Sequence, residues 1–280
     1  MKIEIENLQV SVRGLPAPVT IYHITDSHLC LWDDRDHPAL QEFARTRDQM
    51  FSNGHPGMLE ECFREMLRIA QDGDAIILTG DIIDFPGAAN VDTFADCLKE
   101  NHLPLLYTYG NHDPSPHMFS AEDEPARLAN LARLKEFLPT DPVYDHLDIG
   151  GIRFVGLDNG DRQLSPQQLE KLTEDLSCDM PVVLCMHIPM FTQSLYEPTW
   201  NFWRSAGLFG RTEGVAPEFL PNETTRAGLE LLKNSPNFAA VLAGDIHFSH
   251  DDDLAPGLRQ YVGANGAMRY MRRIRFVPAE

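Results

Sequence analysis

Short apolar runs recur along the chain, and turn residues or polar residues bound each of them. The runs are rich in β-forming residues or Leu and are too short for helices, so they predict buried strands. They lie at Val19–Ile24, Ala75–Leu78, 105–109, Ile152–Leu157, Val182–Met186 and Phe238–Ala243. Residues 3–10 alternate apolar and charged side chains and predict an edge hairpin with Val19–Ile24, while residues 258–277 predict two or three further strands.

Helical patterns lie between these runs. Apolar residues at helical spacing predict helices over 56–71, 91–101, 126–138 and 223–233, with Asn90 and Asn222 as N-caps of the second and the fourth. The third helix is expected to place four leucines on one face: Leu128, Leu131, Leu134 and Leu138. A further helix start is indicated by the capping-box pattern Ser165-Pro166-Gln167-Gln168. Strands that alternate with helices predict an α/β fold in which sheets pack together with helices outside.

Residues 190–221 differ from the rest of the chain because they are rich in Trp, Phe, Pro and Gly. A long irregular stretch in a compact domain is commonly functional, and the aromatic side chains favour an ordered loop at a site. Trp200, Phe202 and Trp203 line the substrate in this interpretation and belong to the core in the alternative one. No linker or repeat interrupts the chain, so we predict one domain over residues 1–280 with this segment as an insertion.

The formal net charge of −19 limits the partners. An acidic surface repels phosphate backbones, which argues against duplex nucleic acid as a partner or substrate. The only basic cluster (Arg269, Arg272, Arg273 and Arg275) is short and lies in a predicted strand, where alternate residues are expected to face solvent. Small phosphorylated substrates stay possible, because metal ions can reverse the field inside one cleft.

The five cysteines are odd in number and form no CxxC pair, so we expect all five to be reduced and structural. That usage fits a reducing compartment. The first ten residues resemble a strand and not a signal peptide, and no apolar run approaches the length of a membrane span. We therefore expect a cytoplasmic protein without a membrane span.

Polar residues able to bind metal follow five of the predicted strands. The sequences are Asp26-Ser27-His28, Gly80-Asp81-Ile82-Ile83-Asp84, Gly110-Asn111-His112-Asp113, a lone His187, and Gly244-Asp245-Ile246-His247. Because ligands of α/β proteins bind beyond the carboxyl ends of strands, we expect these side chains to converge. Within the first and last sequences, residues i and i+2 would point to one side if the backbone is extended.

This set offers carboxylate, amide and imidazole ligands but no thiolate. Mixed oxygen and nitrogen ligands suit Mn, Fe, Zn or Mg and not a structural cysteine zinc site. Seven candidate ligands exceed the needs of one ion and suit two ions that share a carboxylate. Two such ions activate water and stabilise both oxygens of an in-line displacement at phosphorus. Any one of these residues could instead cap a turn. Five independent turn caps, however, would not be expected to consist of metal-binding residue types in every case.

Taken together, the five motifs in this order resemble the calcineurin-like metallophosphoesterases, over most of the chain. The resemblance implies a four-layer α/β/β/α sandwich of two mixed sheets flanked by helices. It implies a first metal held by Asp26, His28 and His247, a second held by Asn111, His187 and Asp245, and Asp81 as the bridge. It further implies that His112 stabilises the leaving oxygen and that Asp84 orients His112. The expected activity is a phosphomonoesterase or phosphodiesterase in which a metal-bridged hydroxide attacks phosphorus.

The chain departs from the family pattern at two places. The last motif is usually Gly-His-x-His, whereas here Asp245 replaces the first His. A carboxylate there either favours a harder ion such as Mn²⁺, Fe or Mg²⁺ over Zn²⁺, or binds the second metal weakly. Phe85-Pro86 follow Asp84 where the protein Ser/Thr phosphatase branch has Arg-Gly, so the guanidinium of that branch is absent at this point.

Several alternatives stay open. Relatives that keep the fold but lose catalysis act as binding scaffolds, although Asn111 and His112 are present here. Asp113 is expected to cap the turn at Pro114, and residues 251–253 to form a solvated turn. Three histidines have undecided roles near the cleft: His55, His117 and His250. Three others, His23, His102 and His146, are expected to be ordinary core or surface residues. The substrate could be a small monoester, diester, cyclic nucleotide or phospholipid head group, and the native metal pair and oligomeric state are undecided.

Overall fold

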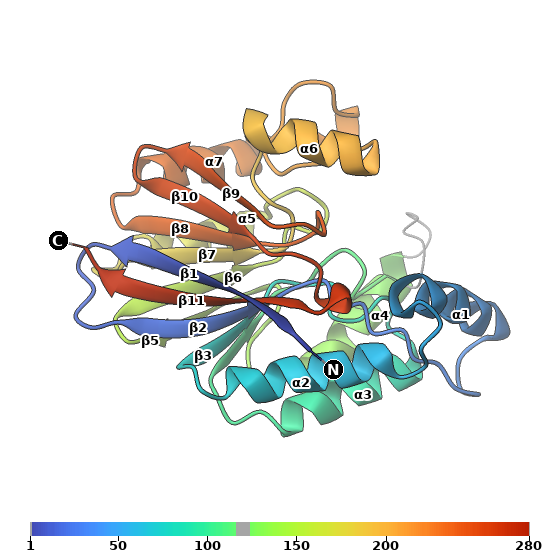
Figure 1. Cartoon of the computed structure of the whole chain (residues 1–280). Helices are drawn as coiled ribbons and strands as arrows, with labels where there is room; N and C mark the ends of the chain where they lie inside the picture. Colours follow the sequence, from blue (N-terminus) through green and yellow to red (C-terminus); the bar gives the residue numbers. More distant parts are fainter. Residues whose placement is uncertain (1, 116–123, 280) are drawn as a thin grey trace.

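The computed structural model describes residues 2–115 and 124–279, with side chains omitted over 124–127, and His117 lies outside this part. Two β-sheets lie face to face and helices cover their outer sides, which makes the four-layer α/β/β/α sandwich (Figure 1). The predicted fold class is thereby confirmed.

The sheets have five and six strands, in the orders β1-β11-β2-β3-β4 and β5-β6-β7-β8-β10-β9. The strands are β1 (Glu4–Val12), β2 (Val19–Ile24), β3 (Ala75–Leu78), β4 (Leu105–Tyr107), β5 (Tyr144–Ile149), β6 (Ile152–Leu157), β7 (Val182–Met186), β8 (Phe238–Ala243), β9 (His250–Ala255), β10 (Leu258–Val262) and β11 (Tyr270–Pro278). The helices are α1 (Pro38–Ser52), α2 (Met58–Ala70), α3 (Ala88–Lys99), α4 (Glu124–Lys135), α5 (Pro166–Asp175), α6 (Gln193–Trp203) and α7 (Glu223–Asn234), with short 3-10 helices η2 (Pro217–Phe219) and η3 (Gly266–Met268).

Strand β2 shows how the layers arise from the sequence. Successive side chains of a strand point to opposite faces of the sheet. Ile21 accordingly joins the cluster between the two sheets, whereas Tyr22 and Ile24 join the cluster beneath α1 to α3. Both faces of the sheet are covered, so β2 and β3 are buried almost throughout. On the other outer face, Leu172 of α5 and Leu232 of α7 are buried against the second sheet.

Parallel pairing sets the edge at which the chemistry lies. Strands β2, β3 and β4 are parallel neighbours in one sheet, and β6, β7, β8 and β10 are parallel neighbours in the other. All their carboxyl ends therefore meet at one end of the sandwich. Helix α1, which the sequence did not predict, lies at that end, on the side away from the C-terminus (Figure 1).

The terminal strands differ from the prediction. The expected hairpin between residues 3–10 and β2 is wrong, because β11 lies between β1 and β2 and pairs parallel with β1. Because β11 occupies the edge of β2 that the hairpin would need, β1 cannot pair with β2. Residues 251–253 belong to edge strand β9 and not to a solvated turn, and the Asp252 carboxylate accepts hydrogen bonds from Thr192 and Ser194.

The basic cluster of the last strand is partly buried. Arg272 is only 2% exposed and pairs with Glu6 and Asp251, each at 2.7 Å. The expectation that alternate arginines face solvent holds for Arg275, which is exposed. Arg272 thus connects β11 to edge strand β1 of one sheet and edge strand β9 of the other, and its role is structural.

Helix ends follow local chemistry in most cases. The capping box at Ser165 is confirmed in full, and the Asn222 side chain caps α7 as predicted. Asn90 does not cap α3, because the helix begins earlier, at Ala88, and the buried Asn90 side chain binds Leu31 N and Phe85 O instead. Leu128 is exposed although Leu131 and Leu134 are buried, so the predicted leucine face of α4 is only partly formed.

The segment 190–221 is less irregular than predicted, because it contains α6. Trp200, Phe202 and Trp203 remain 40% to 59% exposed, whereas Phe209 is buried. The five cysteines are unpaired, and four of them are buried. No helix in the described part of the chain combines the length and apolar character that a membrane crossing needs.

Candidate metal centre

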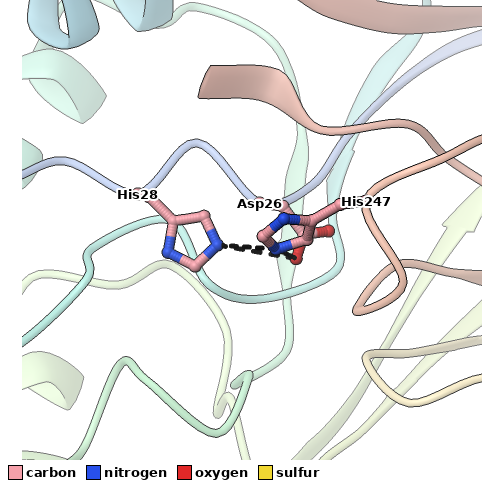
Figure 2. A group of neighbouring side chains, drawn as sticks. All are labelled: Asp26, His28 and His247. Atoms are coloured by element: carbon pink, nitrogen blue, oxygen red, sulfur yellow. Dashed lines mark hydrogen bonds and ion pairs between the residues drawn. The ribbon is translucent and has the colours of Figure 1, made fainter. Parts of the chain in front are cut away.

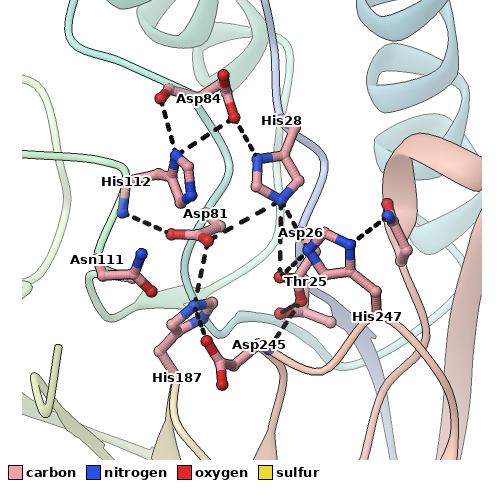
Figure 3. Close-up of polar contacts among 12 residues, drawn as sticks. Thr25, Asp26, His28, Asp81, Asp84, Asn111, His112, His187, Asp245 and His247 are labelled. Carbon is pink, nitrogen blue, oxygen red and sulfur yellow. Dashed lines mark hydrogen bonds and ion pairs between the residues drawn. The ribbon is translucent and has the colours of Figure 1, made fainter. Parts of the chain in front are cut away.

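The side chains that follow β2, β3, β4, β7 and β8 converge at one site between the two sheets (Figure 3). All the predicted ligands and the predicted catalytic pair lie within this group: Asp26, His28, Asp81, Asp84, Asn111, His112, His187, Asp245 and His247. Residues more than 200 positions apart in sequence are in contact, since Nε2 of His28 lies 3.0 Å from Nε2 of His247. The predicted convergence is confirmed.

The first group of side chains consists of Asp26, His28 and His247 (Figure 2). Oδ1 of Asp26 lies 3.3 Å from Nε2 of His247 and 3.8 Å from Nε2 of His28. Two imidazole nitrogens and a carboxylate oxygen therefore face a common point. Such a set can hold a divalent cation.

Asp81 connects this group to a second one. Its Oδ2 lies 3.9 Å from Nε2 of His28 and 3.2 Å from Nε2 of His187. On the far side, Nε2 of His187 lies 3.6 Å from Oδ1 of Asp245. Asp81 thus stands between the two groups, and Asn111 lines the same cavity as Asp81 and Asp245.

Among the predicted ligands, three buried polar atoms lack a hydrogen-bond partner. They are Oδ1 of Asp26, Oδ1 of Asn111 and Nε2 of His187. An unpartnered buried polar atom costs about 1–3 kcal/mol, so proteins rarely leave one without a reason. All three belong to predicted ligands, and each would offer a lone pair once a metal ion displaces the proton that Asp81 otherwise favours on His187. The donor set therefore fits metal ions.

The backbone at these ligands is not extended, contrary to our expectation for residues i and i+2. Five of them adopt the left-handed conformation: Asp26 (φ 52°), His28 (φ 44°), Asp81 (φ 51°), Asp245 (φ 69°) and His247 (φ 65°). This region is unfavourable for residues other than Gly, and such strain concentrates at functional sites. Hydrogen bonds between the loops hold it, including Asp26 N–H to Gly80 O and His28 N–H to Asp81 O.

Glycines allow the loops to approach closely. A Cβ at Gly110 would lie 2.1 Å from Oδ1 of Asp81, and one at Gly244 would lie 1.9 Å from Oγ1 of Thr25. Neither position has room for any side chain. These two glycines of the motifs are therefore required by close packing against the ligand loops.

The carboxylate of Asp84 serves more partners than predicted. It accepts from Nδ1 of His28 at 2.7 Å and receives two hydrogen bonds of 2.6 Å from the Arg47 guanidinium. Nδ1 of His112 lies 3.1 Å from the Asp84 main-chain oxygen and 3.3 Å from Oδ1. Asp84 thus contacts both His28 and His112, and it contacts His112 mainly through its carbonyl group.

Other side chains behind the ligands set their orientation. Thr25 donates to Oδ2 of Asp26 at 2.7 Å, and the Asn265 amide lies 2.9 Å from Nδ1 of His247. Asp113 does not cap the turn at Pro114. Its buried carboxylate accepts backbone N–H groups of Gly110 and of residues 81–83, which ties the β3 loop to the β4 loop.

The concentrated carboxylates favour positive charge at this site. Burial opposes protonation of His187, but the charge and contact of Asp81 outweigh it and raise the His187 pKa well above the ordinary value. The pKa of His112 is also raised, because the charges of Asp81 and Asp84 outweigh the effect of burial. The same potential attracts cations.

A cavity of about 280 Å³ opens directly over the ligands. Its walls include two arginines and several apolar side chains, namely Arg47, Arg162, Met50, Phe51 and Trp203. A larger cavity of about 630 Å³ adjoins it and shares Asn111, His112 and Arg162. Trp203 therefore lines the cavity, in agreement with the first of the two interpretations, and makes edge contact with His247 at a ring distance of 5.0 Å.

Most of the undecided histidines lie elsewhere. His55 is exposed in the turn between α1 and α2, and His250 pairs with Asp252 at 3.6 Å. His23 is a core residue and hydrogen bonds to Thr79, as an ordinary histidine would. His102 and His146 are exposed, as expected.

Sequence reasoning missed three residues near the site: Arg47, Arg162 and Asn265. Arg162 follows β6, and the polar sequence Asp158-Asn159-Gly160-Asp161 after that buried strand was an available signal. Arg47 lies on a helix that the hydrophobic pattern did not reveal. Asn265 carries no signal in the sequence, because its role depends on the loop after β10 meeting the loop after β8.

Comparisons with known proteins agree with this geometry. Three solved structures share the fold: a dimetal phosphatase from Danio rerio (13% identity, TM-score 0.51, 89% of this chain and 88% of that one), purple acid phosphatase PPD1 from yellow lupin, Lupinus luteus (14%, 0.57, 92% and 46%), and PhoD (12%, 0.52, 92% and 58%). The chain thus spans less than two thirds of the length of the last two. No curated protein sequence matches the chain.

The family comparison is more specific. The profile described as calcineurin-like phosphoesterase matches residues 19–249, which include every ligand candidate from Asp26 to His247. Both the order of the motifs and their convergence in space agree with that match. The chain therefore belongs to the calcineurin-like phosphoesterase family.

Proposed function

We propose that the protein is a metal-dependent phosphohydrolase, a phosphomonoesterase or phosphodiesterase that acts on small phosphoesters with two metal ions. The observation that carries the proposal is the set of unpartnered buried atoms on Asp26, Asn111 and His187, which come together from three different loops. The family match supports the chemistry, and the acidic cluster supports the need for cations.

In this proposal the two groups hold one ion each. Asp26, His28 and His247 bind the first ion, and Asn111, His187 and Asp245 bind the second, with Asp81 shared between them. Bound metal ions would supply an activated water molecule as nucleophile and neutralise charge on the phosphoryl oxygens. We further propose Mn²⁺, Fe or Mg²⁺ in preference to Zn²⁺ at the second position, because Asp245 adds a hard carboxylate oxygen there.

His112 is the proposed general acid. Its Nδ1 lies against the Asp84 carbonyl oxygen, an acceptor, so this nitrogen carries a proton and Nε2 is free to face the cavity. Its raised pKa, which arises because Asp81 and Asp84 outweigh burial, favours the imidazolium. The Nε2 proton then passes to the leaving alkoxide oxygen as the ester bond breaks.

The test is a phosphoester panel with protein reconstituted in Mn²⁺, Fe²⁺ or Zn²⁺. We expect turnover of at least one small ester and two metal ions per chain by elemental analysis. His112→Ala should lower kcat by about 10²–10⁴-fold at unchanged metal content, the range for loss of a general acid. Glu170→Gln, on the exposed face of α5, is the control. Near-zero metal uptake with no turnover would replace the proposal with a binding scaffold.

A further inference from the structure

Arg162 occupies a constrained position at the rim of the metal centre. It lies in the loop between β6 and α5, and its backbone is left-handed with φ 65°. Its N–H donates to Asn159 O at 2.8 Å, which closes the turn. The side chain lines both the cavity over the ligands and the larger cavity beside it. A strained backbone that aims a side chain into a cavity is typical of functional residues.

The guanidinium is held in place on two sides. Nε donates to the Gly207 carbonyl oxygen, and the group lies over the ring of Phe219, with Cζ 4.8 Å from the ring centroid. Gly207 is necessary for this packing, because a Cβ there would lie 2.6 Å from Nε and 2.7 Å from Nη2. Most of the rotamer entropy that a flexible Arg loses on binding a ligand has therefore been lost already on folding.

This guanidinium has no carboxylate partner within 4.0 Å in the part of the chain that the structure describes. That is unusual in a chain with 42 acidic and 23 basic residues. The other arginine of the cavity, Arg47, is different, because two of its nitrogens bind Asp84. Arg162 thus presents its positive charge to the cavity without a direct ion pair, and that charge also acts at longer range on the Asp245 carboxylate. A planar fork of this kind matches phosphate oxygens.

We propose that Arg162 binds the phosphoryl group of the substrate through its Nη atoms and makes the site prefer phosphomonoesters over phosphodiesters. A monoester dianion has three non-bridging oxygens and two charges, whereas a diester has two such oxygens and one charge. A guanidinium outside the ligand cluster therefore gains most from the additional oxygen of a monoester. This inference rests on the proposed phosphohydrolase function and supplies from β6 the cation that the sequence lacks after Asp84.

The experiment compares metal-loaded wild type with Arg162→Gln, Arg162→Lys and Gly207→Ala. The charge-matched control is Arg275→Gln, an exposed position on β11. Metal content is measured first. Binding of inorganic phosphate is then measured by titration calorimetry, and kcat/KM is measured for 4-nitrophenyl phosphate and bis(4-nitrophenyl) phosphate.

We expect Arg162→Gln to weaken phosphate binding by roughly 10–100-fold, the worth of a hydrogen bond to a charged group. The monoester kcat/KM should fall by a similar factor while the diester value changes about threefold or less. Arg162→Lys should recover part of the loss, and Gly207→Ala should reproduce part of it without a change of charge. The Arg275→Gln protein should behave as wild type.

Unchanged phosphate affinity in Arg162→Gln, or equal losses for both esters, would overturn the inference. If wild type bound no phosphate, that result would overturn it as well. Failure of the proposed function gives a different result, because the wild type would then hydrolyse neither ester. Phosphate binding measured by calorimetry would still show whether Arg162 contributes to the affinity. If Arg162→Gln lost metal, the Gly207→Ala and Arg162→Lys proteins would decide the question.

Discussion

The two halves of the metal centre differ in how firmly their side chains are supported. In the first half-site, Asp26, His28 and His247 each have a side-chain partner behind them, namely Thr25, Asp84 and Asn265. In the second half-site (Asn111, His187 and Asp245), the ring of His187 is held by the Thr79 carbonyl oxygen at 2.7 Å. Asn111 Oδ1 has no hydrogen bond, and the Asp245 side chain is 25% exposed.

The first half-site is therefore the better preorganised of the two. Ligands whose orientation is fixed by buried partners lose little freedom on binding a metal, and such outer contacts are worth about 10–100-fold in affinity. We therefore expect the first half-site to bind its ion more tightly than the second. The second half-site, with its partly exposed carboxylate, is the one whose occupancy depends on metal supply.

The largest effect should come from removing the residue that both halves share. Asp81→Asn keeps the size of the side chain but removes the charge between His28 and His187. We expect loss of both ions and a fall in kcat of at least about 10³-fold, because groups that act as one unit fail together. Elemental analysis and single-turnover rates measure this. Retention of one full ion would mean that the first half-site stands without Asp81.

Changes within each half-site should separate the two ions. Asp245→Asn should leave the first ion in place and lower the affinity for the second ion by about 10–100-fold. His247→Ala should lower the affinity for the first ion, which binds more tightly, by at least as much. Calorimetric titration with Mn²⁺ resolves the two steps. The comparison fails if both variants weaken the same step, because the two groups would then form a single site.

A smaller effect should follow from loss of support behind the first half-site. Asn265→Ala removes the amide 2.9 Å from Nδ1 of His247 and leaves all ligands in place. We expect affinity for the first ion to fall by about 10-fold, at the lower end of the range for outer contacts. In the second half-site, His187 is held by a main-chain carbonyl group, which no substitution can remove. We therefore pair Asn265→Ala with Thr25→Val, which removes the hydroxyl group behind Asp26. Unchanged affinity in both proteins would show that the support is dispensable.

Substitution of His23, which lies beneath Thr79, should have the smallest effect on activity but a clear effect on the pH dependence of stability. Burial lowers the pKa of His23 to about 3, from an ordinary value of 6.5. Below pH 6.5 the unfolded chain takes up a proton that the folded chain refuses, so stability falls as pH drops from 6.5 toward 3. The total is on the order of 4–5 kcal/mol at 1.4 kcal/mol per pK unit. Urea unfolding of His23→Gln in metal-free buffer should show a smaller dependence over this range; an equal slope would assign the acid sensitivity to other groups.

The residues of the site were largely predictable, but its supports were not. Asp26, Asn111 and His187 follow short buried strands, and the ends of parallel strands must meet, so local pattern sufficed. Arg47 gave no such signal, because it lies on an irregularly patterned helix. The polar run before Arg162 was a weaker signal, because it follows a strand that supplies no ligand. The left-handed backbone at Asp26 and Asp245 was also unpredictable, since hydrogen bonds between loops impose it.

The alternation of strands and helices, the ligand types and their order are properties of local sequence, because side-chain periodicity and turn chemistry act over a few residues. The position of β11 between β1 and β2 depends on pairing between residues 249 to 266 positions apart, which no local pattern encodes. The same holds for the contact of Asn265 with His247 and for the hydrogen bond from Arg162 to the Gly207 carbonyl group. Such contacts exist only once distant segments have packed, because their partners come from loops that folding alone brings together.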